Sequence, residues 1–204
     1  MYMLWFIVIF ISFCVGGIMF SSLIPKAFIK KDITSLSDDL NPGAYNVFKY
    51  SGKGIGTICL LLDFFKGFIP VILVIFFMDY KNVYFSLVMI APVLGHAFGV
   101  FNHFHGGKCI TTSFGVLAAI ARINFWPLIF LASLYIFFSL IIKIESNKAK
   151  SIIVYSSLII FVIAILTNNF NYYAIGVIVI SLIVIIKHIN LKKILNNKLL
   201  KIND

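Results

Sequence analysis

MLWFIVIFISFCVGGIMFSSLI, residues 3–24, contains no charged side chain and is followed at once by Lys26, Lys30 and Lys31. A helix needs about 20 mostly apolar residues to cross the hydrocarbon core of a bilayer, because each residue adds only about 1.5 Å. This run therefore predicts a first transmembrane helix. Its lysines follow the run instead of preceding it, which argues against a cleaved signal peptide and favours an N-terminus outside the cell.

The whole chain has the composition of an integral membrane protein. Of its 204 residues 61% are hydrophobic and 12% are charged, and the mean hydropathy of +1.05 exceeds what a soluble domain needs for its core. We expect an all-α membrane protein of about seven transmembrane helices, forming a single domain over residues 1–204. The further apolar runs are residues 57–78, 83–98, 113–121, 126–142, 151–166 and 172–186. The run 113–121 is short, and a re-entrant piece or a tilt with the next run is the alternative there.

The formal net charge of +10 would suggest a nucleic-acid partner in a soluble protein. Here the basic residues lie in short segments between apolar runs, where they serve as topology signals and contact anionic lipid headgroups, so we expect no nucleic-acid partner. With the N-terminus outside, 14 of the 17 Lys and Arg residues lie on the inside, and the outside loops hold only Lys81 and Arg122. The positive-inside rule then predicts a cytosolic C-terminus. The inside segments are residues 25–56, 99–112, 143–150 and the tail from residue 187.

The first inside segment contains NPGAYNVFKYSGKGIG, residues 41–56, and predicts a phosphate cradle. Its glycines permit positive φ, and with Lys49 and Lys53 they allow backbone N–H groups to converge on an anion at the start of the second helix. The Walker A pattern is not matched. A flexible linker is the alternative that these residues leave open.

Asp63 and Lys66 stand three residues apart within the second apolar run, so they can share a helix face and form an ion pair. A charge inside a membrane is usually functional or part of a structural pair. Two interpretations stay open: a structural pair that fixes this helix against its neighbours, and a direct contact with substrate.

The second glycine-rich segment, GHAFGVFNHFHGGKCITTSFG at residues 95–115, predicts another phosphate site. Gly106, Gly107 and Lys108 open the fourth helix, where the positive end of the helix dipole and the lysine together favour a phosphate oxyanion. His96, near the cytosolic end of the third helix, is either a structural hydrogen-bonding residue or a base.

Neither the histidines nor the cysteines predict a metal site. His103 and His105 would point apart on a helix, and no Asp, Glu or thiolate in usable spacing accompanies them. Cys14, Cys59 and Cys109 share no CxxC or Cys/His spacing, which argues against a zinc site and against a disulfide framework. We therefore expect reduced cysteines that pack, and no metal.

The two glycine-rich segments resemble the second and third signature motifs of the acyl-phosphate-dependent glycerol-3-phosphate acyltransferases, the PlsY family. The family patterns run approximately GN-x-GATNV-x-R-x-x-GK-x-x-G followed by D-x-x-KG, and GH-x-FP-x-F-x-x-FKGGKG-x-AT. Agreement over two long patterns at the right separation is specific, and the hydropathy profile extends the similarity over nearly the whole chain. The matching positions are Gly43, Ala44, Asn46, Val47, Gly52, Lys53, Gly56, Asp63, Lys66, Gly67, Gly95, His96, Phe98, Phe101, Phe104, Gly106, Gly107, Lys108 and Thr112.

The resemblance implies a seven-helix protein of the bacterial cell membrane whose active site faces the cytoplasm. Members of that family transfer a fatty acyl group from acyl phosphate to the first hydroxyl of glycerol 3-phosphate, giving lysophosphatidic acid and phosphate for phospholipid synthesis. The implied partners are these two substrates and the lipid bilayer, and no cofactor is implied. The alternative is a diverged, non-catalytic or differently specific member that binds a phosphorylated lipid or metabolite.

That alternative rests on departures from the family motifs at positions expected to bind phosphate. Thr34 stands where the family has an arginine, Gly99 where it has a proline, His105 where it has a lysine, and Cys109 where it has a glycine. The serine that ends the first helix in the family is displaced by one position.

On the same resemblance, the candidate catalytic residues are Lys108, His96 and Asn190. Lys30 or Lys31 would take over the role of the lost arginine. The candidate substrate-binding residues are Ser22, Lys30, Lys31, Gly43, Asn46, Gly52, Lys53, Gly56, Gly106, Gly107 and His188.

Overall fold

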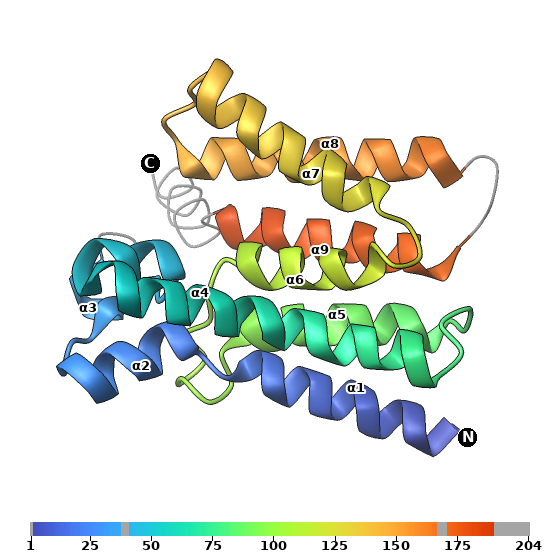
Figure 1. The fold of residues 1–204 in the computed structure, drawn as a ribbon, viewed down its shortest axis with the longest axis horizontal. Helices are drawn as coiled ribbons and strands as arrows, with labels where there is room; N and C mark the ends of the chain where they lie inside the picture. Colours follow the sequence, from blue (N-terminus) through green and yellow to red (C-terminus); the bar gives the residue numbers. More distant parts are fainter. Residues whose placement is uncertain (1, 38–40, 167–170, 190–204) are drawn as a thin grey trace, which may run out of the picture.

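The protein is a bundle of helices, shown as a computed structural model in Figure 1. The structure describes residues 2–37, 41–166 and 171–189, and within these ranges it contains helices and no β-strand. The prediction of an all-α protein is therefore confirmed for this part of the chain. The elements are α1 (Tyr2–Gly17), α2 (Phe20–Ile29), α3 (Ile33–Leu36), α4 (Ala44–Phe77), α5 (Tyr84–Phe98), α6 (Ile110–Ile120), α7 (Trp126–Ile136), the π-helical turn η1 (Phe137–Ile141), α8 (Asn147–Leu166) and α9 (Tyr172–His188).

Each predicted apolar run coincides with a helix or a pair of helices, but the first one is not continuous. The run over residues 3–24 forms parts of two helices, because the chain leaves the helical conformation at Ile18 and Met19 and α2 continues at an angle of 45° to α1. By length and hydropathy, α4 and α8 can each cross a membrane, and the bent pair α1–α2 is a third candidate. The shorter apolar helices are α5, α6, α7 with η1, and α9.

Three helices begin earlier than their hydropathy suggested. α4 already begins at Ala44, within the segment 41–56 that precedes the second apolar run, so this segment is largely helical and the flexible-linker alternative does not hold. Gly52 interrupts this helix with φ of +84°, a left-handed value that glycine adopts without steric cost. α6 and α8 likewise begin three and four residues before the apolar runs at 113 and 151. The first turns of these helices are polar, and hydropathy alone does not register polar helical turns.

Glycines allow close approach in the two helix pairs with the most extensive contacts, α1 with α5 and α4 with α6. A Cβ atom added to Gly16 of α1 would overlap the carbonyl oxygen of Pro92 in α5. A Cβ atom added to Gly115 of α6 would overlap the carbonyl oxygen of Phe64 in α4. Small residues at helix contacts are typical of membrane proteins, where close backbone packing replaces the hydrophobic driving force.

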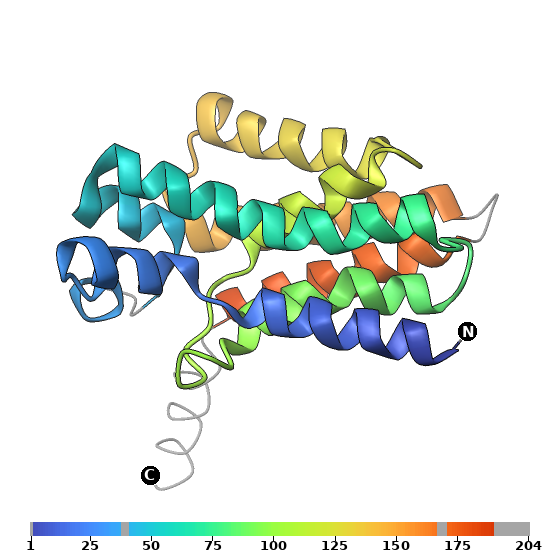
Figure 2. The same ribbon diagram turned by 60° about the horizontal axis from the view of Figure 1, so that its bottom comes forward.

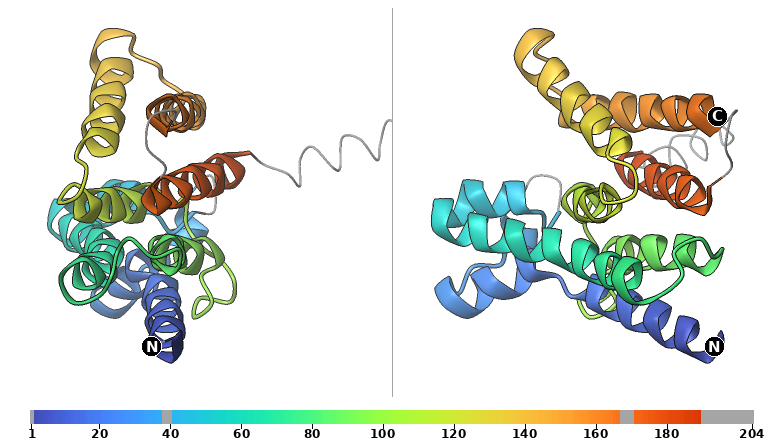
Figure 3. Two further views of the ribbon diagram at one scale, coloured as in Figure 1. Left: turned by 90° about the vertical axis from the view of Figure 1, so that its right-hand side faces the viewer. Right: turned by 45° about the vertical axis from the view of Figure 1, so that its right-hand side comes forward.

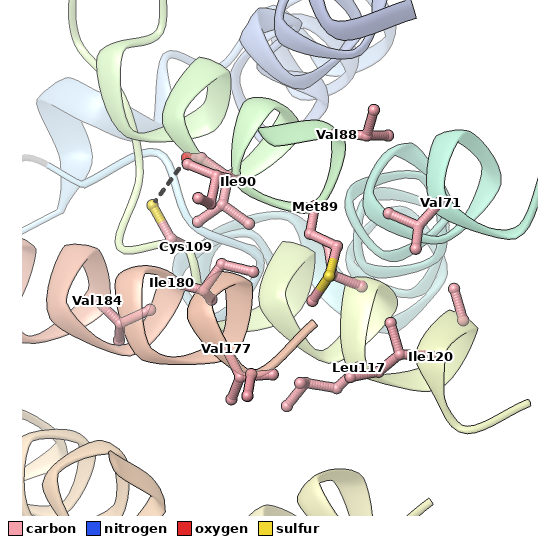
Figure 4. Packing of buried hydrophobic residues seen from close by; sticks show 14 of the residues in the cluster. Val71, Val88, Met89, Ile90, Cys109, Leu117, Ile120, Val177, Ile180 and Val184 are labelled. Carbon is pink, nitrogen blue, oxygen red and sulfur yellow. Dashed lines mark hydrogen bonds between the residues drawn. The ribbon is translucent and has the colours of Figure 1, made fainter. Parts of the chain in front are cut away.

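The centre of the bundle is apolar. Met89 of α5, Leu117 of α6 and Val177 and Ile180 of α9 are fully buried and converge between these helices (Figure 4). Cys109 lies at one end of this core, and its thiol donates a hydrogen bond to the carbonyl of Val93 at 3.5 Å.

Large apolar side chains also cover the outside of the bundle. Phe6, Phe10, Phe28 and Phe77 are between 61% and 80% exposed. Soluble monomers rarely expose contiguous apolar surface on this scale, so this surface is suited to lipid. The prediction of a membrane protein is supported by the fold itself.

One end of the bundle collects the lysine-rich segments. Figures 1 and 2 show α2, α3, the start of α4, the η1–α8 connection and the end of α9 at the end opposite to the N-terminus. The α4–α5 and α6–α7 connections lie at the N-terminal end. Figure 3 shows that α7 and α8 stand on one side of the bundle, where α8 packs against α9. The described parts of the predicted inside segments therefore share one end.

Candidate active site

A cavity of about 540 Å³ opens at the lysine-rich end of the bundle, and we call it the end cavity. Its lining comes from α4 to α9 and from the segments that precede α4 and α6. The residues that line it are Asn41, Gly43, Ala44, Tyr45, Asn46, Phe48, Leu60, Asp63, His96, Lys108, Cys109, Ile110, Thr111, Tyr135, Ser139, Asn147, Lys150, Ser151 and His188.

Three helices start at the end cavity. Ala44 opens α4, Ile110 opens α6 and Asn147 opens α8, and all three residues line the cavity. The N–H groups in the first turn of a helix have no intrahelical partner, and the helix dipole gives that end a partial positive charge. An oxyanion in this cavity is therefore favoured from three directions.

Two lysines add full positive charge to the same cavity. Lys108 precedes the first turn of α6, and Lys150 lies in the first turns of α8. The ammonium of Lys150 donates a hydrogen bond to the hydroxyl of Ser139 in η1 at 3.0 Å. Together with the helix starts, these lysines make the end cavity suited to phosphate groups.

A buried ion pair closes the inner wall of the cavity. The Lys66 ammonium lies 2.8 Å from Asp63 Oδ1, and the Ser21 hydroxyl donates to Asp63 Oδ2 at 2.8 Å. Lys66 also donates to the carbonyl of Ile18 at 2.7 Å, within the break between α1 and α2. The predicted pairing of Asp63 with Lys66 is confirmed, and the contacts support its structural interpretation, because they tie α4 to that break.

His96 lies between this ion pair and the cavity. Its side chain is buried, and its Nδ1 atom lies 4.0 Å from Asp63 Oδ1 without a hydrogen-bond partner among the described residues. The backbone N–H of Gly107 donates to the carbonyl of His96 at 3.0 Å. His96 thus lines the cavity with a buried ring whose Nδ1 atom faces Asp63.

Gly106 and Gly107 do not line the end cavity but position the lysine that follows them. A Cβ atom on Gly106 would overlap the carbonyl oxygen of Ala97, and a Cβ atom on Gly107 would overlap the His96 ring. Only glycines let this segment lie flat against the end of α5. That packing brings Lys108 to the cavity.

Cys109 follows Lys108 and is not suited to nucleophilic chemistry. It is buried and adopts a left-handed conformation with φ of +66° at the N-cap of α6. Burial raises the pKa of its thiol to about 12. The thiol is therefore protonated at neutral pH, so a covalent acyl-cysteine intermediate is not favoured.

The structure brings five of the predicted site residues together. Gly43, Asn46, His96, Lys108 and His188 line the end cavity, although they come from four separate parts of the sequence. His188 is buried, and its Nδ1 atom lies 2.7 Å from the carbonyl oxygen of Val184. The roles of these residues stay predictions.

The other predicted residues lie away from the lining. The Ser22 hydroxyl donates to Asn102 at 3.3 Å, and the Lys31 ammonium donates to the carbonyl of Tyr50 at 2.8 Å. Lys30 ends α2 in a left-handed conformation. Gly52, Lys53 and Gly56 lie on α4 outside the lining, and Asn190 lies outside the described residues. Among the described residues, no group of three His, Cys, Asp or Glu side chains is placed to hold a metal ion.

Sequence reasoning missed one wall of the cavity. Tyr135, Ser139, Asn147, Lys150 and Ser151 line it from α7, η1 and α8, and Tyr135 donates to Ser151 at 3.1 Å. The spacing of i, i+3 and i+4 among the last three residues puts them on one helix face. This spacing could have indicated a polar helix face at the cavity. The sequence analysis instead counted Lys150 only as one of the inside lysines that set the membrane orientation.

These features define a class: a helical membrane protein with a cationic, phosphate-suited cavity at one end of the bundle. The comparisons identify the family. A family model described as glycerol-3-phosphate acyltransferase matches residues 6–197. The chain belongs to this family. The family membership that the two motifs predicted is therefore confirmed.

Relatives and solved structures agree over most of the chain. The glycerol-3-phosphate acyltransferase of Thermotoga petrophila is 33% identical over 203 residues, covering 98% of this chain and 97% of the relative. That of Lawsonia intracellularis is 34% identical over 172 residues, covering 84% and 82%. The crystal structure of PlsY (YgiH), an integral membrane glycerol 3-phosphate acyltransferase, matches in its glycerol 3-phosphate form with a TM-score of 0.78 at 25% identity. Its lysophosphatidic acid form matches with a TM-score of 0.77 at 26% identity, and both comparisons cover 95% of this chain and 92% of PlsY.

Proposed function

We propose that this protein transfers a fatty acyl group from acyl phosphate to the 1-hydroxyl of glycerol 3-phosphate, giving lysophosphatidic acid and phosphate for phospholipid synthesis. The observation that carries the proposal is the convergence of three helix starts and Lys108 on one cavity. Both substrates present a phosphate group, which this arrangement favours. The family, and a related PlsY structure in a glycerol 3-phosphate form, support the choice of acceptor.

The reaction needs positioning more than it needs a strong base. The hydroxyl oxygen of glycerol 3-phosphate attacks the acyl carbon, the bond from that carbon to the phosphate oxygen breaks, and the hydroxyl proton leaves with the phosphate. Acyl phosphate is an activated mixed anhydride, so holding both phosphates in place and stabilising developing charge supply most of the rate. Lys108 lines the cavity just before the start of α6, which supports a role for it in holding phosphate oxygens.

His96 is assigned an orienting role in this scheme. It lines the cavity, is buried beside Asp63, and has an Nδ1 atom without a hydrogen-bond partner among the described residues. A ring nitrogen there can hydrogen-bond the acceptor and align its hydroxyl with the acyl carbon. The roles of Asn46, His188 and Asn190 in binding the acceptor remain part of the proposal.

The proposed orientation places the end cavity at the cytoplasmic face of the bacterial cell membrane, with about seven passes and the N-terminus outside. The positive-inside rule supports it, because the lysine-rich segments share the end that holds the cavity. α6 has 11 residues and is roughly 16 Å long, about half the hydrocarbon thickness. Its length fits the alternative of a re-entrant piece instead of a full crossing.

The test is the release of phosphate from palmitoyl phosphate by purified protein, measured with and without glycerol 3-phosphate. We expect release to depend on the acceptor and to match the lysophosphatidic acid formed, identified by mass spectrometry. Phosphate release that is independent of glycerol 3-phosphate would indicate hydrolysis of palmitoyl phosphate. Substrate binding without phosphate release would favour the non-catalytic alternative.

A further inference from the structure

We propose that Lys150 binds the phosphate group of a substrate in the end cavity, as a second cation beside Lys108. The inference rests on the proposed function for the identity of the ligand. Lys108 and Lys150 are the only Lys or Arg residues among the described residues that line the cavity. Lys150 belongs to neither glycine-rich motif.

The position of Lys150 is fixed from two sides. It shares a face of α8 with Asn147 and Ser151, and this polar face opens onto the cavity while the rest of the helix is largely apolar. Its ammonium is held by the hydroxyl of Ser139 at 3.0 Å. Ser139 belongs to the π-helical turn η1, and π-helical turns occur frequently at functional sites.

The ammonium of Lys150 has N–H donors left to bind a ligand. An ammonium has three N–H donors, and the structure assigns one of them, to Ser139. Lys150 forms no ion pair with a carboxylate of the described residues. The ammonium therefore has N–H donors available for a ligand in a space of about 540 Å³.

Two phosphate groups in one cavity repel each other, and a second cation beside Lys108 lowers that repulsion. Thr34 stands at the arginine position of the family motif, and it does not line the cavity. Lys31, the expected replacement, instead donates to the carbonyl of Tyr50. Lys150 thus supplies to the cavity lining a positive charge that Thr34 and Lys31 do not supply.

The experiment compares Lys150→Ala and Lys150→Arg with Lys148→Ala, an exposed lysine on the same helix that does not line the cavity. In one arm the concentration of glycerol 3-phosphate is varied at saturating palmitoyl phosphate. In the other arm the concentration of palmitoyl phosphate is varied at saturating glycerol 3-phosphate. We expect Lys150→Ala to raise one KM by about 10- to 100-fold, because a hydrogen bond to a charged group is lost. The arm in which KM rises identifies the phosphate that Lys150 binds. Lys150→Arg should keep that KM closer to the wild-type value, and Lys148→Ala should leave both constants unchanged.

The inference would be overturned if Lys150→Ala had the same KM as wild type in both arms. It would also be overturned if Lys148→Ala raised KM as much as Lys150→Ala does. A direct measurement separates this failure from a failure of the proposed function. If wild-type protein forms no lysophosphatidic acid, the proposed function fails, and the rise in melting temperature produced by inorganic phosphate then decides the role of Lys150. We expect a smaller rise for Lys150→Ala than for wild type and Lys148→Ala, and an unchanged rise would exclude phosphate binding by Lys150.

Discussion

The ammonium of Lys66 donates a 2.7 Å hydrogen bond to the carbonyl of Ile18, at the point where the chain leaves the helical conformation between α1 and α2. A helix break inside a membrane leaves backbone carbonyls without intrahelical partners, and hydrocarbon supplies none. Lys66 satisfies one such carbonyl and is itself neutralised by Asp63 at 2.8 Å. The ion pair is therefore part of the fold, and it stands beside the cavity where the chemistry is proposed.

Replacing Lys66 by methionine should destabilise the protein by about 3–5 kcal/mol, because Asp63 would remain as an uncompensated buried charge. The measurement is the melting temperature in detergent. The double variant Asp63→Asn with Lys66→Met should recover much of the loss, since a neutral pair carries no uncompensated charge. A Lys66→Met protein as stable as wild type would show that the pair does not hold the break.

Gly115→Ala should destabilise the contact between α4 and α6 by about 1–3 kcal/mol, because the new Cβ atom would overlap the carbonyl oxygen of Phe64. Gly54→Ala is the matched control, since a Cβ atom there meets nothing within 4 Å. Alanine is the better helix former, so Gly54→Ala should stabilise the protein by about 0.5–1 kcal/mol. The melting temperature of each variant is the measurement. If both substitutions shifted it in the same direction, this packing would be contradicted.

Cys109→Gly should preserve both fold and turnover. Cys109 has φ of +66°, and a non-glycine residue in the left-handed region costs about 1–2 kcal/mol, which offsets the lost burial of the thiol. Cys109→Val should lower stability by at least about 1 kcal/mol, because a β-branched side chain is strained in this region. Thermal unfolding and phosphate release of the two variants give the comparison. A stable valine variant beside an unstable glycine variant would mean that thiol packing outweighs the backbone conformation.

The proposed orientation predicts which positions a membrane-impermeant thiol reagent reaches in intact cells. In a background with Cys14, Cys59 and Cys109 replaced by alanine, a single cysteine at Lys81 should react from outside. A cysteine at Lys53 should react only after the membrane is opened. Reaction at Lys53 in intact cells, with Lys81 protected, would invert the orientation.

The sequence predicted local relationships well. The pairing of Asp63 with Lys66 followed from their spacing on one helix, and of the glycines in residues 41–56, which all permit positive φ, Gly52 adopts it. The break at Ile18 and Met19 could not be predicted from hydropathy, because both residues are apolar and a hydropathy sum does not register backbone conformation.

The candidate site was harder to predict because it is assembled across the sequence. Lys31 is three residues from Thr34, yet nearness in sequence did not place it at the cavity. Lys150 comes from α8, far from both motifs, and only the packing of α7 and α8 on the bundle brings it there. Motif resemblance identifies residues within the motifs, whereas partners contributed by other helices require the fold.

The rate of lysophosphatidic acid formation by Lys108→Ala, compared with wild type and Lys148→Ala, tests most directly whether the end cavity is the site of acyl transfer. Removing the charge at the start of α6 should cost about 2–4 kcal/mol of transition-state stabilisation, a fall of roughly 30- to 1000-fold, while the protein still folds. Lys148→Ala should retain the wild-type rate. A folded Lys108→Ala protein that makes lysophosphatidic acid at the wild-type rate would contradict the assignment of catalysis to this cavity.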